Sequence, residues 1–383
     1  MSGGLLPVMP RQAAMTVNDL LDNCAEVKPG QQVVIVAAFD GLAGGANLVD
    51  ETAIAWLQAG VQQRGAQATV IWTDIPARLH DWRVPPVLKA AVAGADMLIS
   101  HAFDLPFEEL YELRDVMAHH KAVFVRNMAT TAPLLASDWA ATPYELVSEL
   151  RIRTARLFKA GQSWSLSHAN GTSLSGKIRT PLPPGRKYDD YRAEGFYRPF
   201  PEGVFSPVNI ADTNGVLFFE HSSPWWARYM GVPAHFAAPV KVTIENNRIR
   251  GFDGGVEARA MERFVAAMAT RVGDMMYEAF ALHGGVHPHA KLARHQCLND
   301  RYRDFIEHHH WSNLHLHLGV VPPEHRQDYP YFVHITGDLQ GATLKLDEQV
   351  IYDHGRLCTA DLPEIKAIAA RYPGRPGVAG EGV

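Results

Sequence analysis

The chain has 383 residues, of which 47% are hydrophobic and 20% are charged, and its net charge at pH 7 is −5. This composition indicates a globular protein that is long enough for two domains, each with its own core. The acidic balance and the lack of a basic run argue against a nucleic-acid surface or an anionic membrane partner, and no apolar run reaches the roughly 18 residues of a membrane span.

The three cysteines, Cys24, Cys297 and Cys358, are widely spaced and include no CxxC pair. They predict neither a disulfide framework nor a cysteine zinc site. The N-terminal residues MSGGLLPVMPRQAA lack the charged start and the long apolar core of a signal peptide. We therefore expect a soluble, cytoplasmic protein.

The first part of the chain alternates helix and strand signals. The amphipathic segment VNDLLDNCAEV predicts a helix that ends at KPG, and the apolar run QQVVIVAA predicts a strand that is buried on both faces. Further helices are expected at 51–65, 85–95 and 106–120, and further strands at 66–74, 96–102 and 121–127. This order of βαβ units predicts that residues 1–160 form a doubly wound α/β domain with an open, mostly parallel sheet.

The glycine-rich segment FDGLAGGANLVD follows the first predicted strand. It lacks the GxGxxG order of a dinucleotide-binding turn, so we interpret it as a flexible loop between strand and helix.

After residue 160 the pattern changes to that of β-hairpins. Alternating arms flank Asn170-Gly171 in SWSLSHANGTSLSGKI, and VKVTIENNRIRGFDG and LKLDEQVIYDHGRL repeat the design. One long helix is predicted over EARAMERFVAAMATRVG. We therefore expect residues 161–383 to form an α+β domain that is rich in antiparallel strands.

Twelve of the 19 histidines lie between His283 and His354. In LHGGVHPHA the glycines beside His283 and His287 would let the backbone approach a bound ion or substrate. The run HHH at 308–310 follows the charged helical segment NDRYRDFIE, which predicts a solvated helix end.

The segment LHLHL alternates strictly, so His315 and His317 leave one face of a strand while the leucines take the other. That face is either a metal or proton-transfer site, for which His315 is the stronger candidate, or a solvent-exposed surface. In FVHITGD the flanking residues predict a buried strand, in which His334 needs a partner: a metal, Asp338 or a substrate.

Several neutral imidazoles around one ion suit zinc or iron, whereas calcium and magnesium prefer oxygen ligands. The histidine spacing matches no local zinc signature such as HExxH, so a metal site would be assembled from separate strands. In the first domain His101 ends a predicted parallel strand, where α/β sheets place functional groups. The alternative is a histidine that packs a loop.

The order of several segments resembles a known family. These segments are VKPGQQVVIV, PEGVFSPVNIADTNGVLFF, the histidine-bearing glycine segment, FVHI and LKLDEQVIYDHGRL. Together they resemble the metalloaminopeptidases of the aminopeptidase T type, and more closely their 2,5-dihydroxypyridine 5,6-dioxygenase-like branch. The resemblance extends from about residue 16 to about residue 358 and implies the two-domain fold expected above.

Residue by residue, the resemblance matches Glu202 to a metal-bridging glutamate, His315 and His334 to metal-binding histidines, and His101 to a catalytic base. In the glycine-containing segment LHGGVHPHA, the resemblance matches His283 to a further metal-ligand position. Both subfamilies end their ligand set with histidine, one residue, then aspartate, whereas this chain has threonine two residues after His334. Either Asp338 coordinates instead, or another histidine replaces the carboxylate.

These observations lead to a hypothesis. The chain is expected to be a mononuclear non-haem Fe(II) dioxygenase that cleaves a small hydroxylated aromatic or N-heterocyclic ring with O2, with zinc or manganese as alternative metals. The metal ligands would come from His283, His287, His315 and His334, and the catalytic groups are expected to be His101, Glu202 and Asp338. The rivals are a zinc-dependent aminopeptidase or amidohydrolase and a non-catalytic ligand-binding protein of the same fold. A homo-oligomer is expected.

Overall fold

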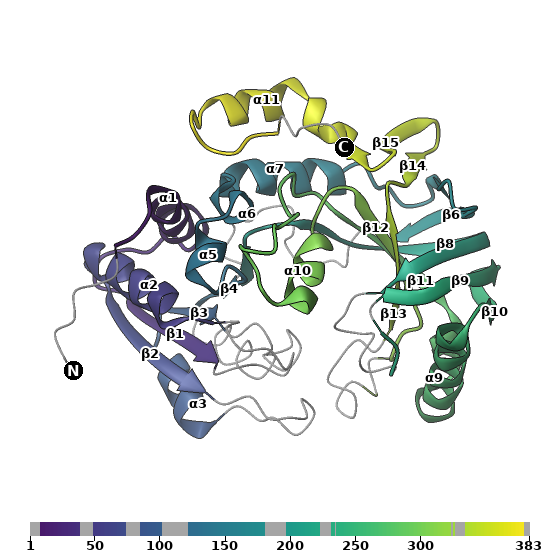
Figure 1. The fold of residues 1–383 in the computed structure, drawn as a ribbon, viewed down its shortest axis with the longest axis horizontal. Helices are drawn as coiled ribbons and strands as arrows, with labels where there is room; N and C mark the ends of the chain where they lie inside the picture. Colours follow the sequence, from purple (N-terminus) through teal and green to yellow (C-terminus); the bar gives the residue numbers. More distant parts are fainter. Residues whose placement is uncertain are drawn as a thin grey trace.

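The computed structural model describes residues 8–38, 49–73, 85–101, 122–180, 197–222, 231–233, 235–322, 325 and 334–378. A parallel sheet with its helices occupies one side of the molecule, and a large antiparallel sheet occupies the other (Figure 1). Helix α7 (Tyr144–Ala155) runs along the upper edge between them. The predicted combination of a parallel α/β part and an antiparallel α+β part is therefore confirmed.

The parallel sheet has the strand order β2-β1-β3-β4-β7, and each neighbouring pair is parallel. Its strands are β1 (Gln32–Ala38), β2 (Gln67–Thr73), β3 (Met97–His101), β4 (Val123–Asn127) and β7 (Tyr197–Phe200). The central strand β3 is buried along its whole length, as its apolar sequence predicts.

Short helices accompany this sheet. They are α1 (Arg11–Asp19), which continues as a π-helical turn over Leu20–Cys24, α2 (Glu51–Gln63), α3 (Pro86–Ala93), α5 (Ala132–Leu135) and α6 (Asp138–Ala141). The side chain of Asp50 caps α2 by accepting from the backbone N–H of Ala53, and it also accepts from Ala132 at the start of α5. The predicted helix at 106–120 and most of the glycine-rich loop lie outside the described residues.

The described residues of the antiparallel sheet follow the order β13-β12-β11-β8-β6-β5-β14-β15-β16, and β9 and β10 branch from β8. The strands are β5 (Ser163–Ser167), β6 (Ser173–Thr180), β8 (Val204–His221), β9 (His235–Glu245), β10 (Arg248–Asp253), β11 (Ala279–Gly285), β12 (Asn313–Leu318), β13 (Ile335–Gln340), β14 (Thr343–Leu346), β15 (Gln349–Asp353) and β16 (Arg356–Leu357).

The three predicted hairpins are confirmed as the pairs β5–β6, β9–β10 and β14–β15. Asn246 and Asn247 both have positive φ at the turn between β9 and β10, which is the backbone conformation that asparagine tolerates best after glycine. The long helix predicted nearby is α9 (Val256–Val272), which lies at the lower right in Figure 1.

The expected domain boundary at residue 160 stays a prediction. Segments from each side of this residue pack in the core of the sheet on the other side. Strand β7 extends the parallel sheet, and Tyr302 and Ile306 of α10 (Asp300–Glu307) pack in the core beneath that sheet. Conversely, Leu146 and Leu150 of α7 pack in the core of the antiparallel sheet. The two halves therefore share elements along their common border.

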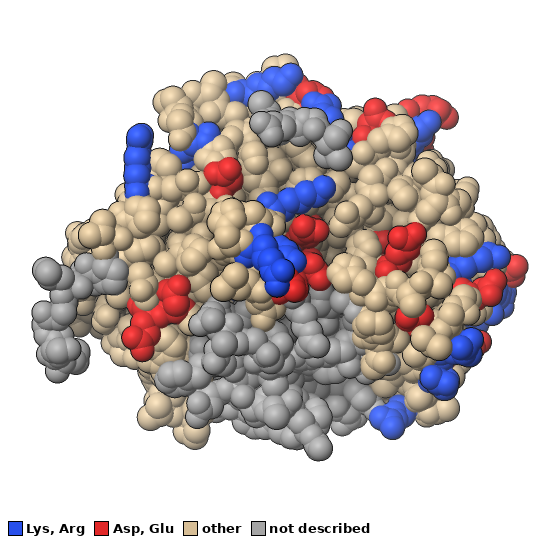
Figure 2. Space-filling model, viewed as in Figure 1, with Lys and Arg blue, Asp and Glu red and all other residues tan. Residues whose placement is uncertain are grey.

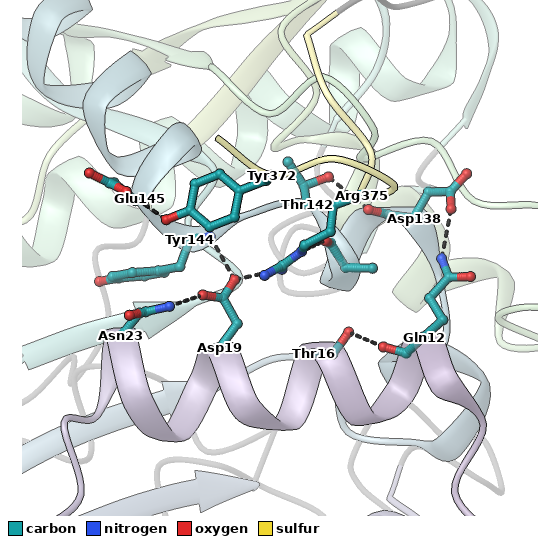
Figure 3. Close-up of polar contacts among 11 residues, drawn as sticks. Gln12, Thr16, Asp19, Asn23, Asp138, Thr142, Tyr144, Glu145, Tyr372 and Arg375 are labelled. Atoms are coloured by element: carbon teal, nitrogen blue, oxygen red, sulfur yellow. Dashed lines mark hydrogen bonds and ion pairs between the residues drawn. The ribbon is translucent and has the colours of Figure 1, made fainter. Parts of the chain in front are cut away.

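The C-terminal segment ties the first helix to α7. After α11 (Pro363–Ala370), Arg375 donates to the buried carboxylate of Asp19 at 2.7 Å, and Asp19 also accepts from the backbone N–H of Tyr144 at 2.8 Å (Figure 3). The hydroxyl of Tyr372 donates to Glu145 at 2.6 Å. Three segments that are far apart in the sequence thus meet at one carboxylate.

The surface that Figure 2 shows carries acidic and basic side chains close to one another over both halves of the molecule. No helix among the described residues is long and apolar enough to cross a membrane.

Candidate metal centre

Three neighbouring strands carry the candidate site. Antiparallel pairing of β11 with β12 sets His283 opposite His315, and pairing of β12 with β13 sets His315 opposite Asp338. Directly opposite residues of antiparallel strands project to the same face of the sheet. The register therefore brings two imidazoles and a carboxylate together from three strands.

The predicted alternation of β12 is confirmed. Leu314, Leu316 and Leu318 pack in the core of the antiparallel sheet, while the rings of His315 and His317 lie nearly parallel on the other face, with centroids 5.3 Å apart. Every residue of this strand is buried. The alternative of a solvent-exposed histidine face is therefore wrong.

Two other imidazoles each bring a nitrogen close to Nε2 of His315. The Nδ1 atom of His283 lies 2.6 Å from Nε2 of His315, and Nε2 of His308 lies 2.9 Å from the same Nε2 atom. His308 comes from the end of α10, not from the sheet. Of its side chain, 12% is exposed.

The prediction that residues 308–310 form a solvated helix end is wrong. His309 and His310 are only 7% and 5% exposed. The physical reason is that Tyr302 and Ile306 of α10 pack in the core of the parallel sheet. The segment that follows the helix is therefore buried, and the carbonyl oxygens of His309 and His310 lie against Gly285 of β11. The charged residues of α10 indicated its solvent face, but they do not determine where the helix ends.

The carboxylate lies on the opposite side of the same two rings. Oδ1 of Asp338 is 3.5 Å from Nδ1 of His308 and 3.9 Å from Nδ1 of His315. The side chain of Asp338 is 2% exposed. The amide Nδ2 of Asn313 lies 3.3 Å from Nδ1 of His308. In both His308 and His315, Nε2 therefore lies on the side of the other imidazoles, and Nδ1 lies on the side of Asp338.

Two sets of residues have ligand atoms within 4.8 Å of one another. They are His283, His315 and His317, and His308, His315 and Asp338. Nitrogens bound to one zinc or iron ion at about 2.0–2.2 Å lie about 3.0–3.5 Å from each other, so spacings of 2.6 and 2.9 Å are close to those of a ligand set.

The electrostatics of the cluster also fit a cation. Burial, together with the neighbouring imidazoles, lowers the pKa of His283, His315 and His317 well below the usual value. These rings are therefore neutral and can offer lone pairs to a metal. Among the described residues, Nδ1 of His315 and Oδ1 of Asp338 are buried without a hydrogen-bond partner. Such atoms indicate a missing partner.

His334 lies next to the cluster. Its ring stacks on that of His317 with centroids 4.2 Å apart and an interplanar angle of 22°. It belongs to neither of the two sets found among the described residues. Thr336, which occupies the position where the resemblance expects an aspartate, lies with its hydroxyl 3.1 Å from that of Ser222. The carboxylate nearest to the imidazoles is instead Asp338, two residues further along β13.

His287 is placed elsewhere, although it is also fully buried. Its Nδ1 atom accepts from the backbone N–H of His289 at 3.0 Å, and it forms an isolated bridge with His310. The glycines beside it have a packing role: a Cβ at Gly285 would lie 2.0 Å from the carbonyl oxygen of His310. The close approach predicted at this segment is thus to the chain's own backbone.

His101 is fully buried at the end of β3. Its Nδ1 atom lies 2.8 Å from Nδ2 of Asn127, and it also hydrogen-bonds the backbone of Thr130. Burial lowers the pKa of His101 to about 3, so the ring is neutral near pH 7. This arrangement matches the loop-packing alternative. Asp104, an acidic residue that could orient the ring from three residues further along the chain, lies outside the described residues.

Glu202 forms a buried ion pair with Arg151. Its Oε2 accepts from Nε of Arg151 at 3.0 Å, and both side chains are about 95% buried, with exposures of 4% and 5%. Burial raises the pKa of Glu202, and Arg151 opposes that shift. Glu202 belongs to neither candidate ligand set among the described residues.

His308 was not predicted as a site residue, and His317 was predicted as a weaker candidate than His315. The strict alternation already placed His317 on the same face as His315. For His308 no local signal existed, because its position depends on how α10 packs.

Neither the family models nor the curated proteins with which the sequence was compared match it. Two solved structures are similar over nearly their whole length. For 2,5-dihydroxypyridine dioxygenase from Pseudomonas putida KT2440 the TM-score is 0.60 and the identity 13%, covering 94% of this chain and 99% of that chain. For wild-type AmpT from Thermus thermophilus the values are 0.51 and 12%, covering 91% and 99%. The resemblance inferred from the sequence is confirmed for the fold, which this chain shares with both proteins.

Proposed function

We propose that the protein is a metal-dependent enzyme whose metal is held by the histidine cluster between β11, β12 and the end of α10. More specifically, we propose a mononuclear non-haem Fe(II) dioxygenase that opens the ring of a small hydroxylated aromatic or N-heterocyclic compound. The observation that carries the proposal is that His308 and His315 meet a single carboxylate, Asp338, in a buried group. Two histidines and one carboxylate are the donors that non-haem Fe(II) oxygenases use.

The small number of carboxylates at the candidate site favours one metal ion over two. Two-metal hydrolysis uses ions about 3.5–4 Å apart that are bridged by carboxylates. Glu202, which resembles a bridging glutamate, is engaged by Arg151. Thr336 stands where a further aspartate is expected. Of the described residues in the two candidate ligand sets, only Asp338 is acidic.

When bound, an iron ion supplies adjacent positions at which a substrate oxygen and O2 can be brought together. The chain's own residues prepare the surroundings. The neutral imidazoles present lone pairs, and the buried carboxylate of Asp338 supplies one compensating negative charge. The leucines of β12 close the back of the sheet, which keeps water from that side.

His101 enters the proposal as the group that accepts a proton from a substrate hydroxyl. It has the neutral ring that a base requires, but Asn127 and Thr130 engage it in the described state. Proton transfer therefore requires that substrate binding release one ring nitrogen from these partners.

A zinc-dependent aminopeptidase or amidohydrolase is the second candidate. The observation that favours it is that His283, His315 and His317 have ligand atoms within 4.8 Å of one another, because three imidazoles are also a zinc ligand set. The likeness to AmpT agrees with this reading at the level of fold alone.

One experiment compares the two candidates. Metal-free protein is loaded with Fe(II) without oxygen or with Zn(II), and each sample is assayed with an oxygen electrode on dihydroxylated pyridines and catechols and with aminoacyl anilides. We expect iron-dependent oxygen uptake, its loss in His315→Ala and its retention in His354→Ala, whose histidine is exposed on the same sheet. Zinc-dependent anilide hydrolysis without oxygen uptake would establish the hydrolase instead. No bound metal in any sample would favour the non-catalytic alternative.

A further inference from the structure

Two groups of ligand atoms in the cluster share one imidazole. The three-histidine group consists of His283, His315 and His317, and the mixed group consists of His308, His315 and Asp338. Within each group the ligand atoms all lie within 4.8 Å of one another, so each group can hold one ion. The groups meet opposite edges of the shared ring. Nε2 of His315 is 2.6 Å from Nδ1 of His283, whereas Nδ1 of His315 is 3.9 Å from Oδ1 of Asp338.

We propose, on the basis of the proposed metal-dependent function, that the cluster holds one ion at a time in either of two overlapping positions. Fe(II) binds the mixed group, and Zn(II) binds the three-histidine group. Because both positions use His315, zinc displaces iron and thereby inhibits the oxygenase.

The donors of the two groups suit different ions. Two imidazoles and a carboxylate are the donor set of non-haem Fe(II) oxygenases, whereas three imidazoles are a zinc set that leaves a fourth position open. The mixed group also supplies one negative charge to a buried ion, through Asp338. Zinc tolerates three neutral donors because its bound water readily loses a proton, and the resulting hydroxide supplies the negative charge instead.

The single proton of the His315 ring makes the two positions exclusive. A neutral imidazole has one N–H and one lone pair, so it gives a lone pair to one ion only. When Nδ1 binds an ion in the mixed group, the proton is on Nε2, 2.6 Å from Nδ1 of His283. When Nε2 binds an ion in the three-histidine group, the proton is on Nδ1 and faces Asp338. In each position a residue of the other group thus orients the shared ring, as is usual for metal-bound histidines.

Each position has an advantage that the other lacks. Among the described residues, Nδ1 of His315 and Oδ1 of Asp338 are buried without a hydrogen-bond partner, and an ion in the mixed group satisfies both. The same ion requires a rearrangement at His308, whose Nε2 lies 2.9 Å from Nε2 of His315. Both Nε2 atoms carry a proton when both Nδ1 atoms bind the ion, so the two N–H groups must turn apart. The three-histidine group makes no such demand on His308, and the identity of the ion therefore decides which position is filled.

The test compares iron and zinc on the same preparations. The full chain is freed of metal and titrated without oxygen with Fe(II) or Zn(II), and X-ray absorption at the iron and zinc edges counts the imidazole ligands. In the wild type we expect one ion per chain, with two imidazoles on iron and three on zinc. Added zinc should release iron one for one, and oxygen uptake should fall in proportion. His354→Ala, whose histidine is exposed on the same sheet, should behave as the wild type.

One substitution unique to each group separates the two positions. His317→Ala should leave Fe(II) binding unchanged, remove one imidazole from zinc and weaken zinc binding by more than about 100-fold, beyond the usual effect of losing an orienting partner. Asp338→Asn should weaken Fe(II) binding by more than about 100-fold, whereas zinc should keep its three imidazoles and lose only about 10-fold. Because each variant keeps one of the two ions, the retained ion shows that the variant is folded.

Two results would overturn the inference. Equal weakening of both ions by both substitutions would show a single position, and simultaneous binding of zinc and iron to one chain would show that the positions do not exclude each other. Either result leaves the metal-dependent function standing. A wild-type chain that binds neither ion overturns both proposals. Binding and displacement as expected, without oxygen uptake by the iron protein, overturns only the dioxygenase.

Discussion

The buried pair of Glu202 and Arg151 allows a sharp test, because the resemblance assigns Glu202 to the metal while the structure pairs it with an arginine. Their side chains are 4% and 5% exposed, and Nε lies 3.0 Å from Oε2. Replacing one partner removes this ion pair from a buried site, which costs about 3–5 kcal/mol of the free energy of unfolding. Glu202→Gln keeps the shape and an acceptor oxygen for Arg151, so we expect a loss near the lower end, about 3 kcal/mol.

The assay combines urea unfolding with metal content on the same preparations. Glu202→Gln and Arg151→Met should each lower the unfolding midpoint and leave the bound metal per chain unchanged. The double variant should lose less than the sum of the two single variants, because both single changes remove the same interaction. If Glu202→Gln abolished metal binding while the unfolding midpoint stayed at the wild-type value, the glutamate would be a metal ligand and the structural interpretation would be refuted.

Three further predictions concern stability. Arg375→Ala removes the ion pair with buried Asp19 and should lower the thermal midpoint, with a loss of about 1–3 kcal/mol for one charge-assisted hydrogen bond. An unchanged midpoint would show that the C-terminal contact contributes nothing. Gly285→Ala should strongly destabilise the folded protein, because the added Cβ would lie 2.0 Å from a carbonyl oxygen. Gly251→Ala, where the added Cβ would meet open space, serves as the control in urea unfolding. Equal effects of the two substitutions would contradict the packing argument. Burial lowers the pKa of His101 to about 3, below the value of roughly 6.5 for an unfolded histidine. As the pH falls, the unfolded state therefore binds the proton first. The free energy of unfolding should fall by up to about 1.4 kcal/mol per pH unit between those two pKa values. His101→Gln should lose less stability than the wild type between about pH 7 and about pH 5, and an equal loss in both would show that His101 is not the group responsible.

Local patterns in the sequence determined much of the fold. The apolar run QQVVIVAA predicts the buried strand β1, and the alternation of LHLHL predicts the two faces of β12. The Asn170-Gly171 turn predicts the hairpin β5–β6. Each of these features depends on residues that are neighbours in the chain, so periodicity and turn chemistry are sufficient to predict them. The same alternation placed His315 among the site residues.

The composition of the candidate site was decided by contacts that are distant in the sequence. Asp338 faces His315 because of the register between β12 and β13, and a hydrophobic pattern specifies which face a strand buries but not which residue of its neighbour lies opposite. His308 joins the site because α10 packs in the core of the other sheet. Glu202 is paired because α7 brings Arg151 to it across 51 residues of sequence. Residue types and strand faces follow from local chemistry, whereas the partners of each polar side chain follow only from the tertiary packing.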